Sequence, residues 1–563
     1  MKMFSFNNIC KILPLSAGLL LVGCSDFLDR ESDSYINKQT TFSSYERTAQ
    51  YLTGVYSLLP EGLNRFGSNA MLGDATDDAE FVIESSNIQK FNLGAWNAID
   101  NPDDQWNRFY AGIRKACEFI ESADQVNLDS YRLDPQSQIE YNNRLKDIRI
   151  WKAEARFLRA YYHFELLKRY GPIPVVTSTL DLNGDYKNTS RPTMKDVVDF
   201  ITKECDEAAN DLELTPWRNV NDALGHATKG AALALKSRTL LYAASPLYVA
   251  FGDINEANKP SDAALWKAAA DATKAVIDLN QYQLADNYGD LFKNDFKNKE
   301  YIFVRRYTAN TNLERSNFPV SFGGEGGTCP SQNLVDDYEM LDGTPFDWNR
   351  PARAAQPFVN RDKRLEATIL MNMASFKNKK VETFPGGADA SPVPNATKTG
   401  YYLRKFLNED VNIQTGGSSS GHVVPLFRLA EIYLNYAEAL NEYDPTNPDI
   451  AVYLNKIRNR ASLPNVPSGL SQEQMRKVIQ HERRIELAFE EHRFWDVRRW
   501  KIASSTLGAP VKGIQIARKP AGGFTYQPVE VEQRVFQPKM YWYPIPQSEL
   551  LKLTKWEQNN GWN

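Results

Sequence analysis

Two carboxylates near the C-terminal end of this 563-residue chain, Glu486 and Glu490, have the spacing that acid–base chemistry could use. They lie four residues apart, so a helix would place both on one face. Paired carboxylates can act as the acid and base, or as the nucleophile, of glycoside hydrolysis. The alternative is a structural ion-pair network, which we favour because dense charge runs are usually structural.

The same run contains residues that would pair with these carboxylates and bury them. Arg493 lies three residues after Glu490, and Asp496 and Arg499 repeat the opposition of charge at i,i+3 spacing. Large rings are packed among these charges: Phe489, Phe494, Trp495 and Trp500. The sequence predicts a long, largely buried helix over 472–500 whose ion pairs close the domain, because a buried charge without its partner is costly.

Other catalytic and ligand-binding patterns are incomplete. His481-Glu482 begins like a zinc-protease motif, but Ile485 stands where the second histidine would be. Gly324-Glu325-Gly326 lacks the strand–turn–helix context of a nucleotide site, and no GxxxxGK[ST] or GxSxG occurs. With a pI of about 5.9 and no basic stripe, the composition argues against nucleic acid as a partner. We predict no catalytic residues, no cofactor and no metal site, and leave open a structural calcium ion among loop carboxylates.

Apolar residues at helical spacing predict a mostly α protein. The expected helices cover 42–59, 103–122, 135–170, 193–212, 227–249, 261–279, 425–442 and 450–461. Amphipathic helices joined in pairs by short turns indicate a tetratricopeptide-like αα-superhelix, although no clean 34-residue period is present. His163 lies in the aromatic stripe of the third helix, and we interpret it as a satisfied core histidine. Cys117, Cys205 and Cys329 are expected to be buried small hydrophobic residues.

Residues 281–423 differ from the helical parts of the chain. They contain twelve of the 31 glycines, and helical periodicity is visible only over 363–374. A short strand is expected at 301–304, and the tail after the last helix, 501–563, is expected to be irregular. We predict loops and short strands inserted between helix pairs, where function often resides.

Several stretches resemble one family over essentially the whole mature chain: RYGPIP, LFRLAEIYLNYAEALNE, RIELAFEEHRFWDVRRW and YPIPQSEL. The chain is similar to the SusD/RagB family of starch-utilisation-system type, nutrient-binding outer-membrane lipoproteins of Bacteroidetes. The family usually has Glu-Gly where this chain has Glu490-Glu491, a change expected to suit a helix interior. By this resemblance, the structural signature of the helix is Glu486, Glu490, Arg493, Trp495, Asp496 and Arg499.

The N-terminal residues predict a processing signal and a lipid anchor. Residues 1–23 carry Lys2 and Lys11 before a short apolar run, which is typical of a signal peptide. The run ends in LVGC, which resembles a lipobox, so Cys24 would be lipidated with acyl chains such as palmitate. Residues 24–40 would form an acidic tether at the outer membrane, and the protein would face the cell exterior. The expected regions that follow are 41–280, 281–423 and 424–563.

The resemblance implies a non-enzymatic surface protein that captures oligosaccharides and covers a SusC-like TonB-dependent β-barrel transporter as a lid. Aromatic rings could stack on sugar faces while polar groups bond the hydroxyls. From loop position and chemistry, the predicted ligand-binding residues are Trp96, Asn97, Asn101, Tyr288, Phe322 and Trp348. Trp96 could instead be a plug that caps the core. The alternatives are a binder of peptides or another nutrient, a surface glycan hydrolase, and a scaffold that binds the transporter but no small ligand.

Overall fold

The structure, a computed structural model, describes residues 37–563 except 67–68, 182, 217–224, 294–296 and 414–417. The predicted signal peptide, Cys24 and most of the predicted tether lie outside the described residues. Within the described residues, no helix combines the length and apolar composition needed to cross a bilayer.

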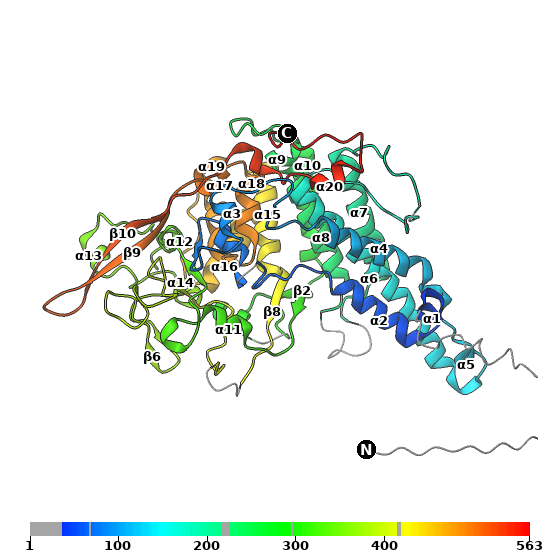
Figure 1. Cartoon of the computed structure of the whole chain (residues 1–563), viewed down its shortest axis with the longest axis horizontal. Helices are drawn as coiled ribbons and strands as arrows, with labels where there is room; N and C mark the ends of the chain where they lie inside the picture. Colours follow the sequence, from blue (N-terminus) through cyan, green and yellow to red (C-terminus); the bar gives the residue numbers. More distant parts are fainter. Residues whose placement is uncertain (1–36, 67–68, 182, 217–224, 294–296, 414–417) are drawn as a thin grey trace, which may run out of the picture.

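The first part of the chain is a stack of helices (Figure 1). Its elements are α1 (Lys38–Phe42), α2 (Tyr45–Tyr56), α3 (Gln89–Asn92), α4 (Trp106–Ser122), α5 (Asp129–Arg132), α6 (Gln138–Tyr170), α7 (Met194–Asp211), α8 (Lys229–Ala244), α9 (Pro246–Val249) and α10 (Ala263–Ile277). Side-chain caps begin several of them: Ser44 caps α2, Thr193 forms a capping box on α7, and Asp262 caps α10. At the end of α6, Gly171 has a φ of 73°, which glycine adopts without strain.

The long helices pack one against the next, which confirms the predicted αα-superhelix. α6 contacts α4 and α7, α7 contacts α8, α8 contacts α10, and α10 contacts α15 (Leu429–Tyr443). His163 on α6 is fully buried, and its Nδ1 lies 2.8 Å from the Arg159 carbonyl oxygen. Burial lowers the pKa of His163 to about 3, so this histidine is neutral core, as predicted. The three described cysteines are buried and free.

The region between α10 and α15 contains short helices and two-stranded sheets. The helical elements are η6 (Tyr288–Phe292), α11 (Asn312–Asn317), η7 (Val320–Phe322), α12 (Gln332–Asp337), α13 (Pro351–Ala355) and α14 (Lys363–Thr368). One strand pair includes β1, which comes from the first part of the chain and follows η3 (Leu72–Ala75). The antiparallel pairs are β1 (Ala79–Phe81) with β3 (Thr328–Pro330), β2 (Tyr301–Arg306) with β8 (Val423–Arg428), β4 (Ile369–Leu370) with β7 (Tyr402–Leu403), and β5 (Ser375–Phe376) with β6 (Lys379–Lys380).

This arrangement confirms the strand predicted at 301–304 and corrects two predicted helices. The helix expected over 363–374 ends at Thr368, because Ile369 and Leu370 pair with β7. The helix expected over 425–442 begins at Leu429, since the preceding six residues form β8, which is buried on both faces. An apolar run of that kind fits a buried strand as well as a helix.

The C-terminal part contains α16 (Asp449–Arg460), α17 (Gln472–Glu486), α18 (His492–Arg499), α19 (Ala503–Thr506), η8 (Pro538–Tyr541) and α20 (Gln547–Leu550). The tail was predicted to be irregular, and this was wrong for 511–532. There β9 (Val511–Arg518) and β10 (Phe524–Glu532) form a long hairpin that projects from the body (Figure 1).

The single helix predicted over 472–500 is instead two helices, α17 and α18. The chain breaks between them because Phe489 and Glu491 have φ values of 61° and 63°, in the left-handed region. Glu491 is the residue that precedes α18, so the expectation that it suits a helix interior better than glycine was wrong. Glycine would adopt this conformation freely.

Two hydrophobic cores meet at this break. The first core lies among the stacked helices and includes Phe494 and Trp495 from α18. The second core lies under the loop-rich region and includes Ile485 and Phe489. The pair α17–α18 therefore joins the helical stack to the loop-rich region (Figure 1).

Candidate functional site

The carboxylate of Glu486 is buried at the centre of an ion network. It accepts hydrogen bonds from Arg364 on α14 (3.0 Å) and Arg428 on β8 (2.6 Å), and it also pairs with Arg460 on α16. Burial opposes ionisation, but the three guanidinium groups hold the pKa of Glu486 well below its usual range. A carboxylate fixed in the ionised state cannot serve as a proton donor.

Glu490 is held in the same way. Its oxygens accept from Arg428 and from Lys405, each at 2.7 Å. The Lys405 ammonium also donates to the Ala488 carbonyl oxygen (2.7 Å) and the Tyr288 hydroxyl (2.8 Å). Both carboxylates thus have cations as partners, which confirms the ion-pair network predicted for this run.

The remaining signature residues follow the prediction in part. Asp496 bonds Arg499 at 2.8 Å and Arg483 at 2.7 Å, as the i,i+3 spacing predicted for the first pair. Arg493, expected to pair with Glu486 and Glu490, instead bonds Asp77 at 2.8 and 2.9 Å. The break before α18 turns Arg493 away from the α17 face, so the sequence spacing no longer applies. The indole of Trp495 is buried, as predicted.

Two of the predicted ligand-binding rings are buried, which corrects the expectation that they form an exposed platform. Trp96 is 3% exposed and packs between Phe91, Tyr543 and Trp562, with ring centroids 4.7–5.2 Å apart. Trp96 therefore caps the core, which was the alternative prediction for this residue. Tyr288 is 5% exposed, and its hydroxyl donates to the Glu486 carbonyl oxygen at 3.2 Å.

The two predicted asparagines shape the loop beside Trp96. The Asn97 side-chain oxygen accepts from the backbone N–H groups of Ile99 (2.8 Å) and Asp100 (3.1 Å). The Asn101 oxygen accepts from the Asp103 N–H at 3.0 Å. These are turns of the kind that asparagine forms with its own backbone. The structure therefore separates Trp96 and its neighbours, which belong to the first core, from Tyr288, which belongs to the second.

Two adjoining clefts open on the loop-rich region, and we call them the paired clefts. The first cleft has a volume of about 630 Å³ and is lined by Asn287, Gly289, Asp290, Phe292, Lys293, Lys363, Glu366, Ala367, Arg404, Lys405, Phe406, Leu407, Asn408, Glu409 and Asp410. The second has a volume of about 570 Å³ and is lined by Ser321, Phe322, Lys377, Asn378, Lys379, Glu409, Asp410, Asn412 and Ile413. Glu409 and Asp410 line both clefts, so the two clefts adjoin at these residues.

The Glu409 carboxylate on this shared wall is held in place. It accepts from Arg404 at 2.7 and 2.9 Å and from the Lys377 backbone N–H at 3.1 Å. The Arg404 and Glu409 side chains are 31% and 32% exposed, so they are positioned and still reach solvent. Such groups can bond hydroxyls without paying the full cost of leaving water.

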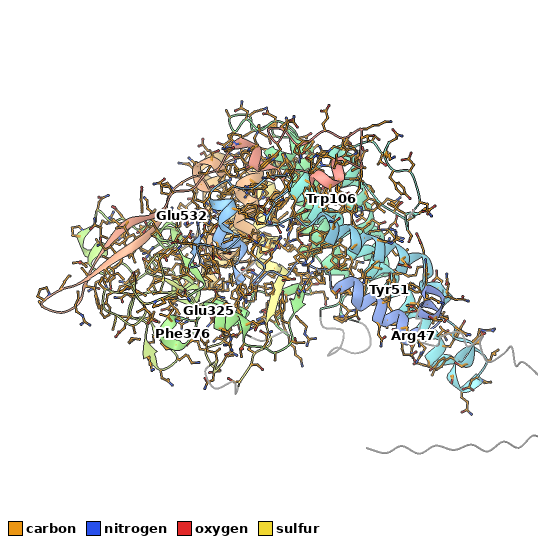
Figure 2. All side chains as sticks on the ribbon, in the orientation of Figure 1. Arg47, Tyr51, Trp106, Glu325, Phe376 and Glu532 are labelled. Atoms are coloured by element: carbon orange, nitrogen blue, oxygen red, sulfur yellow. The ribbon has the colours of Figure 1, made fainter. Side chains whose placement is uncertain are left out.

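Phe322 is the predicted binding residue that lines a cleft. Its half-buried ring packs edge to face on Phe376, with centroids 5.1 Å apart (Figure 2 labels Phe376). Tyr288 lies under the first cleft, in contact with the lining residues Phe292 and Lys405. Trp348 lines neither cleft: its indole Nε1 donates to Asp336 at 2.9 Å, and its ring packs on Phe346.

Sequence reasoning missed most of the polar cleft residues. Lys377 and Asn378 form the β5–β6 turn, Lys379 begins β6, and Arg404 to Asp410 follow β7. Their only signal was the position of polar residues in loops. In the part of the chain that the structure describes, no three His, Cys, Asp or Glu side chains gather as a metal-ligand group.

Two family models match the chain. One, described as SusD family, matches residues 291–562, and the other, described as starch-binding associating with outer membrane, matches residues 26–241. SusD-like protein P2 of Formosa agariphila is 23% identical over 511 residues, which are 87% of this chain and 90% of the relative. A SusD-like protein of Bacteroides ovatus is 23% identical over 523 residues, 89% of this chain and 83% of the relative.

Solved structures show the same fold. A SusD-like protein from Bacteroides fragilis superposes with a TM-score of 0.76 at 26% identity and covers 93% of this chain and 98% of that protein. A SusD-like carbohydrate binding protein from the same species gives 0.74 at 26% identity, with coverage of 92% and 100%. Because the two family models together span most of the sequence and agree with these relatives and structures, the chain belongs to the SusD family.

Proposed function

We propose that this protein captures oligosaccharides in the paired clefts at the cell surface and delivers them to a SusC-like TonB-dependent transporter. Cys24 would carry the lipid anchor at the outer membrane, with the protein facing the exterior. The observation that carries the proposal is the half-exposed Phe322 ring in a cleft that adjoins a second cleft at Glu409 and Asp410.

The size and lining of the clefts suit a chain of sugars. Each cleft lies within the range of roughly 300–1,000 Å³ that holds a small ligand, so the two together could accommodate several sugar units. A ring such as Phe322 offers an apolar face to the C–H groups of a pyranose. The amide, ammonium and carboxylate groups of the lining would bond its hydroxyls.

Family membership supports the same proposal. The model that matches residues 26–241 is described as starch-binding and associated with the outer membrane, and one structural relative is described as carbohydrate binding. The transporter partner and the role as a lid are part of the proposal because the family resemblance implies them.

A peptide ligand is the second candidate, favoured by the charge of the first cleft. Lysine and arginine side chains line it together with four carboxylates, Asp290, Glu366, Glu409 and Asp410. Opposite charges at close range could bind the ends or side chains of a short peptide.

The test is a binding screen of the soluble mature protein lacking Cys24. Affinity electrophoresis against a polysaccharide panel should show retardation by one glycan, and calorimetry should then give its affinity. Phe322→Ala should weaken that affinity about tenfold, in line with the ~0.5–1.5 kcal/mol of an aromatic contact plus lost burial. Phe358→Ala is the matched control, because Phe358 is also half-buried but lines neither cleft.

Other outcomes would replace the proposal. Peptide binding without glycan binding would favour the second candidate. Release of reducing ends would indicate a hydrolase. Binding to the transporter alone would indicate a scaffold.

A further inference from the structure

The end of the molecule opposite the β9–β10 hairpin is formed by α5 and its neighbours (Figure 1), and it carries exposed apolar side chains. There α5 and the first turns of α6 extend beyond the rest of the helical stack. Leu133, at the end of α5, is 71% exposed, and Ile139, in the first turn of α6, is 78% exposed. Leu145, further along α6, is 45% exposed. We call these three residues the arm tip.

A groove lined by both apolar and charged side chains runs beside the arm tip. It has a volume of about 490 Å³, and Leu145 belongs both to its wall and to the arm tip. The groove is lined by Ile120, Asp124, Val126, Leu128, Leu145, Ile148, Arg149, Lys152, Ala153, Arg156 and Asp211. Isolated exposed leucines are ordinary, whereas several exposed apolar side chains at one end of a molecule, rimmed by charged residues, are typical of an interaction site.

The described chain begins at this same end. Helix α1 packs beside the 3₁₀ turn Ala123–Gln125, and the Asn127 N–H donates to the Ser43 carbonyl oxygen at 3.0 Å. Asn37, the first described residue, caps α1. From Cys24 to Asn37 is 13 residues. At roughly 3.3–3.6 Å per residue, even a fully extended connection would span no more than about 45 Å.

We propose that the arm tip rests on the membrane to which Cys24 is anchored, with Leu133, Ile139 and Leu145 in contact with lipid. This inference rests on the lipid anchor of the proposed function. Because the anchored segment joins the described chain at this end, the arm tip stays within reach of the bilayer.

The chemistry of this end fits a lipid surface. The Arg149 side chain is 58% exposed, and its nearest contact with Asp211 is a long ion pair of 3.7 Å. The Lys38 side chain is 46% exposed and forms a similarly long pair, 3.8 Å, with Glu118. Such cations can approach anionic headgroups. Tyr131 and Tyr141 are half-buried next to the tip, and tyrosine is enriched at membrane interfaces. Contact at the arm tip would fix the orientation of a protein that its acyl chains already retain.

The experiment uses the lipidated full chain in vesicles of phosphatidylethanolamine and phosphatidylglycerol. Nitroxide labels are placed singly at Ile139→Cys and Leu133→Cys, and a control label at Tyr443→Cys, an exposed position on α15. The three native cysteines that the structure describes are buried. Collision with oxygen, which concentrates in lipid, is compared with collision with a water-soluble nickel complex.

We expect the arm-tip labels to be accessible to oxygen and shielded from nickel on vesicles, and the Tyr443→Cys label to remain accessible to nickel. Nickel access at both arm-tip labels in the vesicle-bound protein would overturn the proposal. Shielding that requires added transporter would overturn it in favour of a protein contact.

A second experiment tests membrane contact without a label at Leu133 or Ile139. The pair Leu133→Asp and Ile139→Asp should leave flotation with the vesicles intact, because the lipid anchor remains, but should return a Leu145→Cys label to water. An unchanged Leu145→Cys label would contradict membrane contact at the arm tip. Glycan binding in solution should be the same in both backgrounds, so a failure of the paired clefts would be seen separately. A chain that does not float at all would overturn the anchor and this inference with it.

Discussion

The α17–α18 junction and the paired clefts both contain many charged side chains, but those at the junction are buried and those at the clefts are exposed. At the junction, Glu486 and its partners are at most 4% exposed, and the carboxylate meets three arginines. At the clefts, the Lys293–Asp290 pair is 73% and 55% exposed. Buried pairs must be complete, since each missing partner leaves an uncompensated charge. Exposed pairs contribute little to stability and can exchange water for a ligand.

The largest effect should come from breaking the junction network. Glu486→Gln removes the negative charge that Arg364, Arg428 and Arg460 share. We expect a loss of about 3–5 kcal/mol in the free energy of unfolding, measured with denaturant. Asp199→Asn, which removes the exposed partner of Lys195, is the control and should change stability by less than about 0.5 kcal/mol. Equal effects of the two variants would remove the contrast between buried and exposed charge.

Trp96→Ala tests whether this ring belongs to the core or to the binding surface. Because Trp96 is 3% exposed among three other rings, its removal should leave a cavity and cost about 3–5 kcal/mol of stability. Thermal or chemical denaturation would measure the loss. In the variant that remains folded, glycan affinity should be unchanged, and a selective loss of affinity would place Trp96 in the binding site.

Asp74 sharpens the comparison because it is fully buried with no ion pair among the described residues. Burial raises its pKa to about 7, although the Met71 N–H and the Thr328 hydroxyl donate to it. A raised folded-state pKa stabilises the protein fully below the ordinary value of 3.8, and this stability is lost as pH rises toward 7. The loss can reach about 1.4 kcal/mol per pH unit.

Stability curves of the wild type and Asp74→Asn, taken between pH 4.5 and 7, would test this. The wild type should lose stability relative to the variant as pH rises. Parallel curves would show that Asp74 is ionised in the folded protein. Glu486, whose folded-state pKa is lowered, stabilises the protein fully above about pH 4.5, and this stabilisation is lost only as pH falls below that value.

The smallest effect concerns the backbone of the break. Glu491→Val and Glu491→Gly both remove the carboxylate that bonds Arg65 at 3.0 Å, so they differ in the φ preference of the new residue. Because the φ at this position is 63°, the free energy of unfolding of Glu491→Val should be lower than that of Glu491→Gly by about 1–2 kcal/mol. Denaturant midpoints measure the difference, and equal midpoints would contradict the left-handed conformation.

The sequence was sufficient to predict features with local causes. Helical periodicity predicted α4, α6, α7 and α10 to within a few residues of their bounds, and the i,i+3 spacing predicted the Asp496–Arg499 pair. Features that depend on tertiary contacts were not predictable. The partner of Arg493 is Asp77, more than four hundred residues away, and the break before α18 has no glycine or proline to announce it.

The binding residues show the same limit. Trp96, Tyr288, Phe322 and Trp348 all lie near turn residues in the sequence, so their exposure could not be ranked. Their exposure depends on tertiary packing: Trp96 and Tyr288 are buried in the two cores, whereas Phe322 lines a cleft. The residues that complete the clefts come from separate loops, which only the fold brings together.

We propose that the paired clefts bind ligand while the buried junction holds the fold. The most direct measurement is calorimetric titration of the selected glycan into Phe322→Ala, with the free energy of unfolding determined on the same sample. We predict an affinity about tenfold weaker, a change of about 1.4 kcal/mol, with the cooperative unfolding transition retained. Unchanged affinity in a folded Phe322→Ala protein would contradict the account and move the binding site elsewhere on the molecule.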